Sequence, residues 1–264
     1  MSVESKLRGL RQILQFDNRL HLLLQRLFFR GDVLAVYRKG PLEILVDQGG
    51  GDANGAPEVL THPMYADHLA YLVTAHPARV LDVGANNGGF PLFLALHGVR
   101  FERLVSVELN PRTCTRLRFN LERNIPGDVR VVNAALAGTA RTFELALGAG
   151  SVADSLYARS DNASGAATVV AGRTFDELFD AHFAGQDVDI CKIDVEQAEY
   201  EVMANPGHDR LRRCRLLVME IHAVPGRSPS EVIDPILALG FELLPQGRDT
   251  SVFVFRNRIA AASA

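Results

Sequence analysis

Apolar positions along most of the chain recur with two periods, one typical of strands and one typical of helices. From residue 58 onward, short apolar runs of strand length alternate with stretches of helix length. We expect strands over residues 79–83, 103–108, 129–135, 188–194 and 215–221, and helices over residues 63–76, 88–97, 111–123, 174–183, 197–204 and 229–239. This alternation predicts an α/β fold, a mostly parallel Rossmann-like sheet with helices on both faces.

Two more strands are predicted towards the C-terminus, over residues 241–244 and 251–255. Only residues 245–250 connect them, which is too short for a parallel crossover. The two strands therefore pair antiparallel, and the seven-stranded sheet contains one reversed strand near the C-terminus.

The first 57 residues predict an appendage to this domain. Leucine spacing indicates a helix over residues 1–30, and two apolar runs, 33–37 and 42–47, indicate a hairpin. A glycine-rich loop over residues 49–55 is expected to be flexible. The helix either docks on its own domain, mediates a homodimer, covers a substrate or lies on a membrane surface. We divide the chain into the appendage (1–57), the α/β domain (58–258) and a tail (259–264).

Composition narrows the class of protein. The 264 residues are 47% hydrophobic and 22% charged, as in ordinary globular proteins, and the formal net charge is −3. This balance argues against a nucleic-acid partner, because such partners usually require a basic face. The three cysteines have no CxxC spacing, and no apolar run is long enough to span a membrane. With no apolar signal core at the N-terminus, these features predict a cytoplasmic protein without a transmembrane segment.

A glycine turn after the first strand of the domain carries the first candidate site. The strand ends in Asp82-Val83, the turn reads Gly84-Ala85-Asn86-Asn87-Gly88, and an apolar helix follows at once. Such a turn lets the backbone approach a nucleoside-bearing ligand closely, because glycine has no Cβ. Glu108 ends the next strand, 24 residues after Gly84. At this spacing a carboxylate can accept hydrogen bonds from both hydroxyls of a ribose.

NAD and S-adenosylmethionine both fit that spacing. A dinucleotide fingerprint requires G-x-G-x-x-G, and the chain has Asn86 in place of the middle glycine. Asn86 disfavours a pyrophosphate at the turn, so the sequence favours S-adenosylmethionine. A nucleotide-dependent oxidoreductase stays open as the alternative.

The second candidate site follows the strand at 188–194. Alternation puts Lys192, Asp194 and Glu196 on one face, which is costly in a central strand unless the charges are paired or solvated. One interpretation is an internal Lys192–Asp194 ion pair with Glu196 capping the next helix. The other is a site in which Asp194 and Glu196 face a ligand cleft. Glu220 and His222 alternate in the same way at the end of the next strand and favour a site.

These motifs resemble those of a known family, the FkbM-type methyltransferases, which are class I enzymes that use S-adenosylmethionine and mostly methylate hydroxyl oxygens. The resemblance covers roughly residues 78–225. It is carried by Asp82-Val83-Gly84-Ala85-Asn86-Asn87-Gly88, Val107-Glu108-Leu109-Asn110-Pro111, Asn120-Leu121, Val132-Asn133-Ala134-Ala135-Leu136, Thr174-Phe175-Asp176-Glu177-Leu178, Lys192-Ile193-Asp194-Val195-Glu196 and Glu220-Ile221-His222. One departure is Gln197, where the family usually has Gly. Gln197 either tolerates a conformation that Gly accepts more easily or narrows the adjacent cleft.

The resemblance implies a pocket for S-adenosylmethionine at the carboxyl ends of the strands. Glu108 would bind the ribose, and Asp194 would lie nearest the transferred methyl group. Asn110 would support the ribose, or instead cap the helix that begins at Pro111. The residues assigned to the cofactor are Asp82, Gly84, Ala85, Asn86 and Gly88 at the turn, Glu108 and Asn110, Asn133 and Ala134 beside the adenine, and Asp194.

Transfer of a methyl group to a hydroxyl needs a base within hydrogen-bonding distance of the acceptor. The candidates are Asp194, Glu220 and His222, with His222 preferred because an unperturbed imidazole is largely neutral at pH 7. A carboxylate with a raised pKa is the alternative. The same three side chains could hold a divalent metal, although no sequence pattern requires one.

The resemblance suggests a hydroxyl of a sugar, a glycan or a small natural product as the acceptor. Residues 1–65 and a loop rich in Gly, Ala and Ser at 148–172 are expected to form its wall. Ser151, Ser155 and Tyr157 of that loop either contact the acceptor or belong to a mobile, solvated loop. A non-catalytic adenosyl-binding protein stays open as a further alternative.

Overall fold

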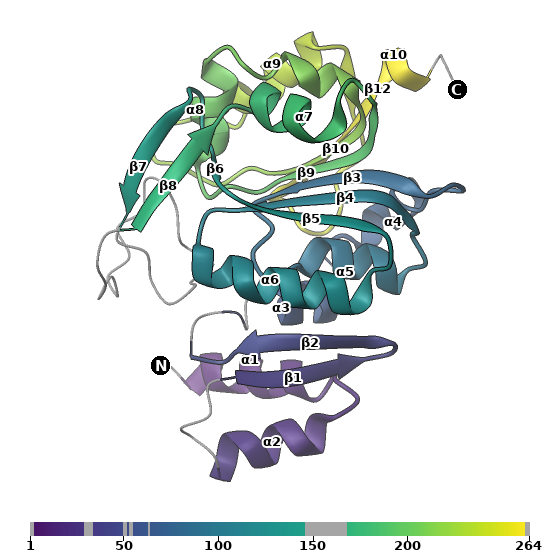
Figure 1. Cartoon of the computed structure of the whole chain (residues 1–264), viewed down its shortest axis with the longest axis vertical. Coiled ribbons are helices and arrows are strands. Elements are labelled where there is room, and N and C mark those ends of the chain that lie inside the picture. The colour runs from purple at the N-terminus through teal and green to yellow at the C-terminus, as the bar shows by residue number, and fades with distance from the viewer. Residues whose placement is uncertain are drawn as a thin grey trace.

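The computed structural model describes residues 3–28, 34–49, 52, 55–62, 64–145 and 168–261. A seven-stranded sheet runs through the main domain in the order β11-β12-β10-β9-β3-β4-β5 (Figure 1). Strand β12 pairs antiparallel with both of its neighbours, and the pairs β10·β9, β9·β3, β3·β4 and β4·β5 are parallel. The strands are β3 (Ala78–Val83), β4 (Phe101–Glu108), β5 (Asp128–Asn133), β9 (Val188–Ile193), β10 (Cys214–Glu220), β11 (Phe241–Leu243) and β12 (Val252–Asn257). The predicted fold, with its single reversed strand, is confirmed.

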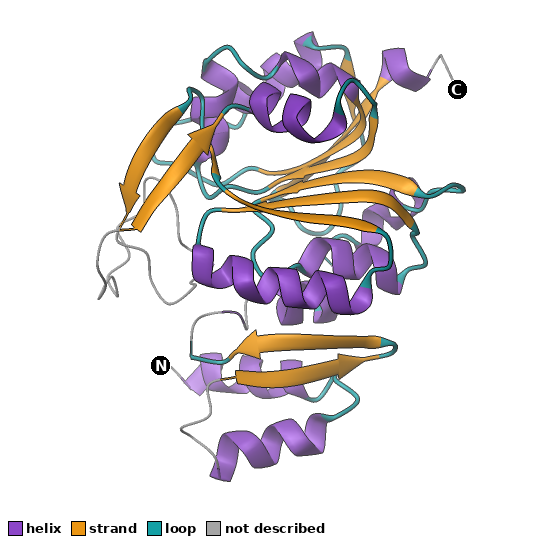
Figure 2. Cartoon of the chain, viewed as in Figure 1, coloured by secondary structure: helices purple, strands orange, loops and turns teal. Residues whose placement is uncertain are grey.

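Helices cover both faces of this sheet (Figures 1 and 2). Successive side chains along each strand point to opposite faces of the sheet, so each strand contributes to two separate hydrophobic cores. In β3, Val80 joins the core beneath α5 and α6, whereas Leu81 and Val83 join the core beneath α7, α8 and α9. The helices are α5 (Gly89–Leu96), α6 (Pro111–Asn124), α7 (Phe175–Phe183), α8 (Ala198–Ala204) and α9 (Ser230–Ala238), with a short α10 (Arg258–Ala261) after β12. A 3-10 helix, Asp209–Arg213, precedes β10.

The N-terminal appendage contains two helices, α1 (Val3–Ile13) and α2 (Arg19–Phe28), and the hairpin β1 (Leu34–Lys39) and β2 (Leu42–Asp47). A single helix over residues 1–30 was therefore a wrong expectation. The break lies at short polar side chains that bond to the hairpin instead of continuing the helix. Asn18 accepts from the backbone N–H of Arg38 and donates to the carbonyl of Val36, and Asp17 accepts from the N–H of Gly40.

The hairpin docks on α6 of the main domain. Asn120 accepts from the N–H of Leu45 and donates to its carbonyl, and Asn124 does the same for Glu43. The loop that follows the hairpin, residues 49–55, was expected to be flexible, yet Asp52 within it is fully buried. Its carboxylate receives two hydrogen bonds from the Arg116 guanidinium, at 2.6 and 2.8 Å.

Three other stretches differ from the sequence-based expectation. The helix expected at 63–76 is replaced by the earlier α3 (Ala56–Thr61), a 3-10 helix (Ala66–His68) and the short α4 (Leu69–Leu72). The strand expected at 129–135 divides into β5 and β6 (Ala135–Leu136). Strands β6, β7 (Arg141–Leu145) and β8 (Thr168–Arg173) form a second sheet, in the order β6-β8-β7. Residues 168–172 are thus strand and not loop, because their β-branched residues pair with β7. Ser151, Ser155 and Tyr157 lie outside the described residues.

In the described part of the chain, no helix combines the length and the apolar character needed to cross a membrane.

Candidate active site

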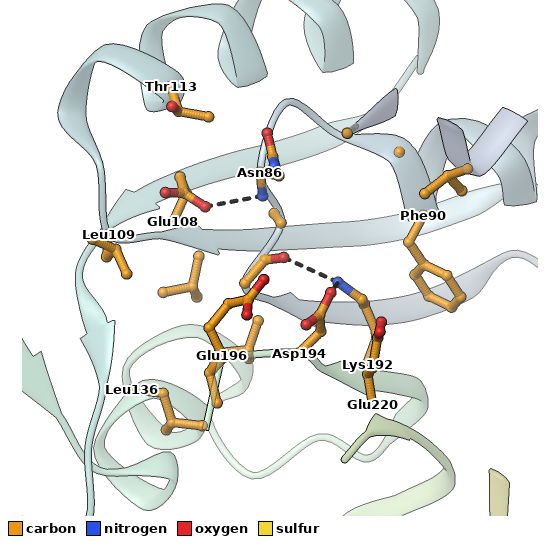
Figure 3. Close-up of a pocket in the computed structure, with 18 of the residues that line it drawn as sticks. Asn86, Phe90, Glu108, Leu109, Thr113, Leu136, Lys192, Asp194, Glu196 and Glu220 are labelled. Atoms are coloured by element: carbon orange, nitrogen blue, oxygen red, sulfur yellow. Dashed lines mark hydrogen bonds and ion pairs between the residues drawn. The ribbon is translucent and has the colours of Figure 1, made fainter. Parts of the chain in front are cut away.

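A cavity of about 310 Å³ opens at the carboxyl ends of β3, β4, β9 and β10 (Figure 3). Open parallel sheets place ligand sites at this edge, where each strand turns into the next loop. Here the four strand ends contribute the Gly84 turn, Glu108, Asp194 with Glu196, and Glu220. Segments that are distant in the sequence therefore converge on one site.

The glycine turn lies directly against the end of β9. Gly84 has φ +78°, and a Cβ added there would lie 1.6 Å from the carbonyl oxygen of Asp194. The same approach brings the N–H of Asp194 to the carbonyl of Val83, at 3.0 Å. Only glycine permits both the left-handed backbone and this contact. The predicted reason for a glycine was a close ligand; the structure shows that the neighbouring strand also requires it.

Glu108 faces the cavity and bonds to two backbone groups. One carboxylate oxygen accepts from the N–H of Asn86 at 2.9 Å (Figure 3), and the other accepts from the N–H of Asn110 at 2.8 Å. A carboxylate has about four acceptor positions. Each oxygen therefore retains capacity for a further donor, such as a hydroxyl of a diol.

Two residues assigned to the cofactor use their side chains to hydrogen-bond to nearby backbone groups. Asn110 caps α6, where it accepts from the N–H groups of Arg112 and Thr113, and it does not line the cavity. Asn133 donates to the carbonyls of Glu108 and Leu109, whereas its neighbour Ala134 does line the cavity.

Lys192 is buried and connects three elements of the site. Its Nζ lies 3.0 Å from Asp194 Oδ2, 3.0 Å from the carbonyl oxygen of Gly84 and 3.7 Å from Asp82 Oδ1. Burial opposes its charge, but Asp194 and Asp82 outweigh that effect and hold its pKa above the ordinary value. The internal Lys192–Asp194 ion pair is therefore present, and it coexists with an Asp194 that lines the cavity.

Asp82 lies beneath the turn and does not line the cavity. It is fully buried, and neither carboxylate oxygen has a hydrogen-bond partner among the described residues. Burial raises its pKa to about 6, and the nearby Lys192 ammonium limits the rise. Gly88 likewise has a local role, because its left-handed backbone (φ +98°) begins α5.

Four carboxylates surround His222. Nδ1 lies 2.9 Å from an oxygen of Glu199, which is fully buried. Nε2 faces the other three: Glu196 at 3.4 Å, Asp194 at 3.8 Å and Glu220 at 3.9 Å. We call these five side chains the His222 cluster. The second oxygen of Glu199 has no hydrogen-bond partner among the described residues, and the first also accepts from the N–H of Val195.

This environment changes the protonation of the cluster. Burial lowers the pKa of His222, but the hydrogen bond and charge of Glu199, with Asp194 and Glu196, outweigh it and raise that pKa to about 9. Burial raises the pKa of Glu196 to about 7, and burial together with Asp194 raises that of Glu220 to about 7. At neutral pH the imidazole therefore carries a proton, so the premise of an unperturbed His222 base does not hold in this structure.

The motifs did not identify Tyr65, Phe90 or Glu199 as parts of the site. Tyr65 and Phe90 line the cavity and stack edge-to-face with ring centroids 5.0 Å apart. Neither belongs to a motif, so only packing could reveal them. Glu199 follows the Lys192–Glu196 run, and its place three residues after Glu196 was the available signal.

A metal site has limited support from the geometry. Among the described residues, ligand atoms of Asp194, Glu199 and His222 lie within 4.8 Å of one another, so Glu199 takes the place expected for Glu220. An ion bound there would compete with the hydrogen bond between Glu199 and His222.

The main sheet is mostly parallel with one reversed strand, and acidic residues stand at the ends of adjacent strands. A family model, described as the methyltransferase FkbM domain, matches residues 82–243. The chain belongs to the FkbM methyltransferase family.

Solved structures with similar folds include three methyltransferases of low sequence identity. Methyltransferase FkbM from Methylobacillus flagellatus KT is 14% identical, with a TM-score of 0.46, and the match covers 68% of this chain and 43% of that one. A tRNA (uracil-54, C5)-methyltransferase of Pyrococcus abyssi, in complex with S-adenosyl-L-homocysteine, is 10% identical (TM-score 0.43; 85% and 44% covered). A precorrin-6y C5,15-methyltransferase from Geobacter metallireducens GS-15 is 15% identical (TM-score 0.41; 72% and 85% covered). The chain thus spans less than half of the first two proteins. No curated protein matches it.

Gln197, where the family usually has Gly, adopts φ +81°, and Glu196 before it adopts φ +50°. Two consecutive left-handed residues are unfavourable for side chains with a Cβ. Gln197 does not line the cavity. It therefore tolerates the conformation suited to Gly and leaves the width of the cleft unchanged. Glu196 faces the cavity and His222, and Gln197, the N-cap of α8, makes no side-chain capping hydrogen bond.

Proposed function

We propose that this chain transfers the methyl group of S-adenosylmethionine to a hydroxyl oxygen of a sugar, a glycan or a small natural product. The observation that supports it is Glu220, a carboxylate at the cavity whose pKa is raised to about 7. A general base is most effective when its pKa lies near the working pH. An alcohol needs such a base, because it is a weak nucleophile at neutral pH.

The cofactor pocket fits the methyl donor at several points. Glu108 offers both carboxylate oxygens at the cavity, as a ribose diol requires. Leu109, Ala134 and Leu136 provide apolar lining nearby, which suits an aromatic base. The carboxylate of Asp194 supplies negative charge at the end of β9, which suits the cationic end of the donor.

The donor, when bound, supplies an electrophilic methyl group on a sulfonium. The acceptor oxygen forms a bond to that methyl carbon as the carbon–sulfur bond breaks, and the acceptor proton passes to Glu220. Alignment of the acceptor accounts for much of the rate in such a displacement. Lys192 holds Asp194 at 3.0 Å and the Gly84 carbonyl at 3.0 Å, and so fixes the wall against which the acceptor aligns.

His222 has a positioning role in this proposal. Its protonated ring lies among Asp194, Glu196 and Glu220, and it offsets their mutual repulsion. Glu199 fixes the ring by accepting from Nδ1. A neutral His222 that acts as the base is the second candidate, and the pH profile of a His222 variant separates the two.

The charge of the cavity favours neutral acceptors. Five carboxylates line it, those of Glu58, Glu108, Asp194, Glu196 and Glu220, and Lys192 is the cation among the lining residues. Lys192 is already bonded to Asp194. A phosphate or a nucleic acid would meet net negative charge, which supports a sugar or natural-product hydroxyl over an RNA acceptor.

The test combines binding and turnover. S-adenosylhomocysteine binding is measured by calorimetry in the wild type, in Glu220→Gln and in a matched surface control, Glu231→Gln. Methyl transfer is then measured against a panel of hydroxylated sugars and polyketides. We expect Glu220→Gln to bind the cofactor product as the wild type does and to lose at least about 100-fold in kcat, since a positioned base contributes about that much. An unchanged kcat in Glu220→Gln refutes this base.

Turnover has to be separated from mere cofactor binding. A wild type that binds S-adenosylhomocysteine but methylates no member of the panel, with or without added Mg²⁺, supports a non-catalytic adenosyl-binding protein. Transfer to amines but not to hydroxyls would exclude O-methylation.

A further inference from the structure

Exposed apolar side chains concentrate in the N-terminal appendage. Among the described residues, fifteen large hydrophobic side chains are exposed, and nine of them lie between residues 7 and 36. Contiguous exposed apolar surface of this kind marks an interaction site in soluble proteins. The nine are Leu7, Leu10, Leu14, Leu20, Leu24, Leu27, Phe28, Leu34 and Val36.

Helix α2 turns its apolar side away from the molecule. Leu22 is fully buried, and Gln25 donates to the carbonyl of Leu34 on β1, so this side of the helix is attached to the appendage. At 3.6 residues per turn, positions 20, 24 and 27 lie roughly opposite Leu22. Leu20, Leu24, Leu27 and Phe28 are 72%, 53%, 59% and 68% exposed. We call these four side chains the outer α2 face.

The position of α2 leaves this face accessible. The helix lies at the end of the molecule farthest from the seven-stranded sheet, beyond the β1–β2 hairpin (Figure 1). The active-site cavity has no lining residue from α1, α2 or the hairpin. The outer α2 face is therefore a feature apart from the methyl-transfer site.

The charge of the N-terminal residues favours one kind of partner for the outer α2 face. Residues 1–32 contain six Lys or Arg and three Asp or Glu, although the whole chain has a net charge of −3. Arg11, Arg19 and Arg26 are exposed, although the Arg26 guanidinium lies against Gly9 of α1. A second copy would bring two basic appendages together, which is unfavourable, whereas an anionic surface attracts them.

We propose that the outer α2 face docks on an anionic lipid surface. Its leucines and Phe28 enter the boundary between headgroups and acyl chains, and the exposed Arg19, in the first turn of the helix, reaches the lipid phosphates with its long side chain. The helix lies in the plane of the interface. Basic residues near an anionic leaflet strengthen such binding and make it sensitive to salt. This inference does not depend on the proposed acceptor or base.

The test uses the full chain and vesicles of defined composition. Co-sedimentation is measured with phosphatidylcholine vesicles and with vesicles that contain about 30% phosphatidylglycerol, at low and high salt. The variant is Leu24→Gln with Leu27→Gln, which keeps the charge and the helix propensity. The matched control is Val169→Gln with Leu243→Gln, which removes two exposed apolar side chains from the main domain. Thermal unfolding and S-adenosylhomocysteine binding establish that both variants fold.

We expect the wild type and the control to bind the anionic vesicles at least about tenfold more tightly than the neutral ones, with weaker binding at high salt. The Leu24→Gln, Leu27→Gln variant should lose at least about tenfold in binding to the anionic vesicles. Equal binding by this variant and the wild type would overturn the proposal. So would a wild type that binds anionic vesicles no more tightly than neutral ones. A wild-type dimer in light scattering that the variant converts to a monomer, without vesicle binding, would assign the face to a second copy.

Discussion

Replacing Glu199 by Gln should release the proton on His222 at a lower pH. Glu199 is the cluster member closest to the ring, at 2.9 Å, whereas Glu196, Asp194 and Glu220 lie at 3.4 to 3.9 Å. Glutamine has nearly the same shape and can still accept from Nδ1–H, but it lacks the charge. The variant therefore isolates the electrostatic contribution of a residue that the motifs did not identify.

The size of the effect follows from the cluster. A rise in the His222 pKa from 6.5 to about 9 corresponds to roughly 3 kcal/mol in favour of the imidazolium, because each tenfold change in the protonation equilibrium corresponds to about 1.36 kcal/mol. Glu199, as the nearest carboxylate and the hydrogen-bonded one, should contribute roughly half of this, because charge-assisted hydrogen bonds are the stronger ones. We expect the pKa of His222 to fall by about one, to about 8 in Glu199→Gln.

The assay is an NMR titration of the His222 ring, assigned by its absence in a His222→Gln variant. Glu196→Gln, which removes a carboxylate farther from the ring, at 3.4 Å from Nε2, should lower the pKa of His222 less. Glu231→Gln, on exposed α9 surface, should leave it unchanged. A His222 pKa that stays at about 9 in Glu199→Gln would refute the electrostatic account of the cluster.

Three further outcomes are expected. In Glu108→Gln, S-adenosylhomocysteine should bind about 10- to 100-fold more weakly by calorimetry, because a hydrogen bond to a charged group contributes about 1.5–3 kcal/mol; unchanged affinity would contradict the ribose assignment. Gln197→Gly should raise the free energy of unfolding by about 1 kcal/mol, since it relieves a left-handed Gln at φ +81°. Ala184→Gly, at φ +43° outside the site, is the matched comparison, and a loss of stability in both would contradict the strain argument. The raised pKa values of Asp82 (about 6), Glu196 and Glu220 (about 7) and His222 (about 9) mean that the folded chain binds more protons than the unfolded chain. Stability in urea should therefore fall as the pH rises from about 5 to about 9, and a rise over that range would contradict the shifts.

Much of the sheet could be predicted because its buried strands contain mainly apolar residues. In β9, all six residues from Val188 to Ile193 are buried, and four of them are apolar. The short link between β11 and β12 predicted the reversed strand by chain length alone. Strands β7 and β8 were not predicted, because they stabilise each other across residues 146–167 and neither has a strong pattern.

The candidate site was predicted in part, and the reason again differs from residue to residue. Glu108, Asp194 and Glu220 end strands, so their place at one edge of the sheet follows from topology. Asn110 and Asn133 stand in the same motifs, but their amides bond to nearby backbone groups. Sequence spacing cannot distinguish a side chain that faces the cavity from one that bonds to nearby backbone, because in both cases a polar residue stands at a strand end.

The sequence by itself determined the order along the chain of the seven main-sheet strands and of the helices between them, the glycine turn and the acidic strand ends, because these depend on local periodicity and on chain length. Only the tertiary structure decided which charges meet. It brought Glu199 to His222 across 23 positions and buried Asp82 beneath Lys192. It also turned the apolar side of α2 outward. The pKa of a side chain depends on its burial and on all neighbouring charges at once. The raised pKa of His222 therefore follows from the assembled sheet and not from the local sequence.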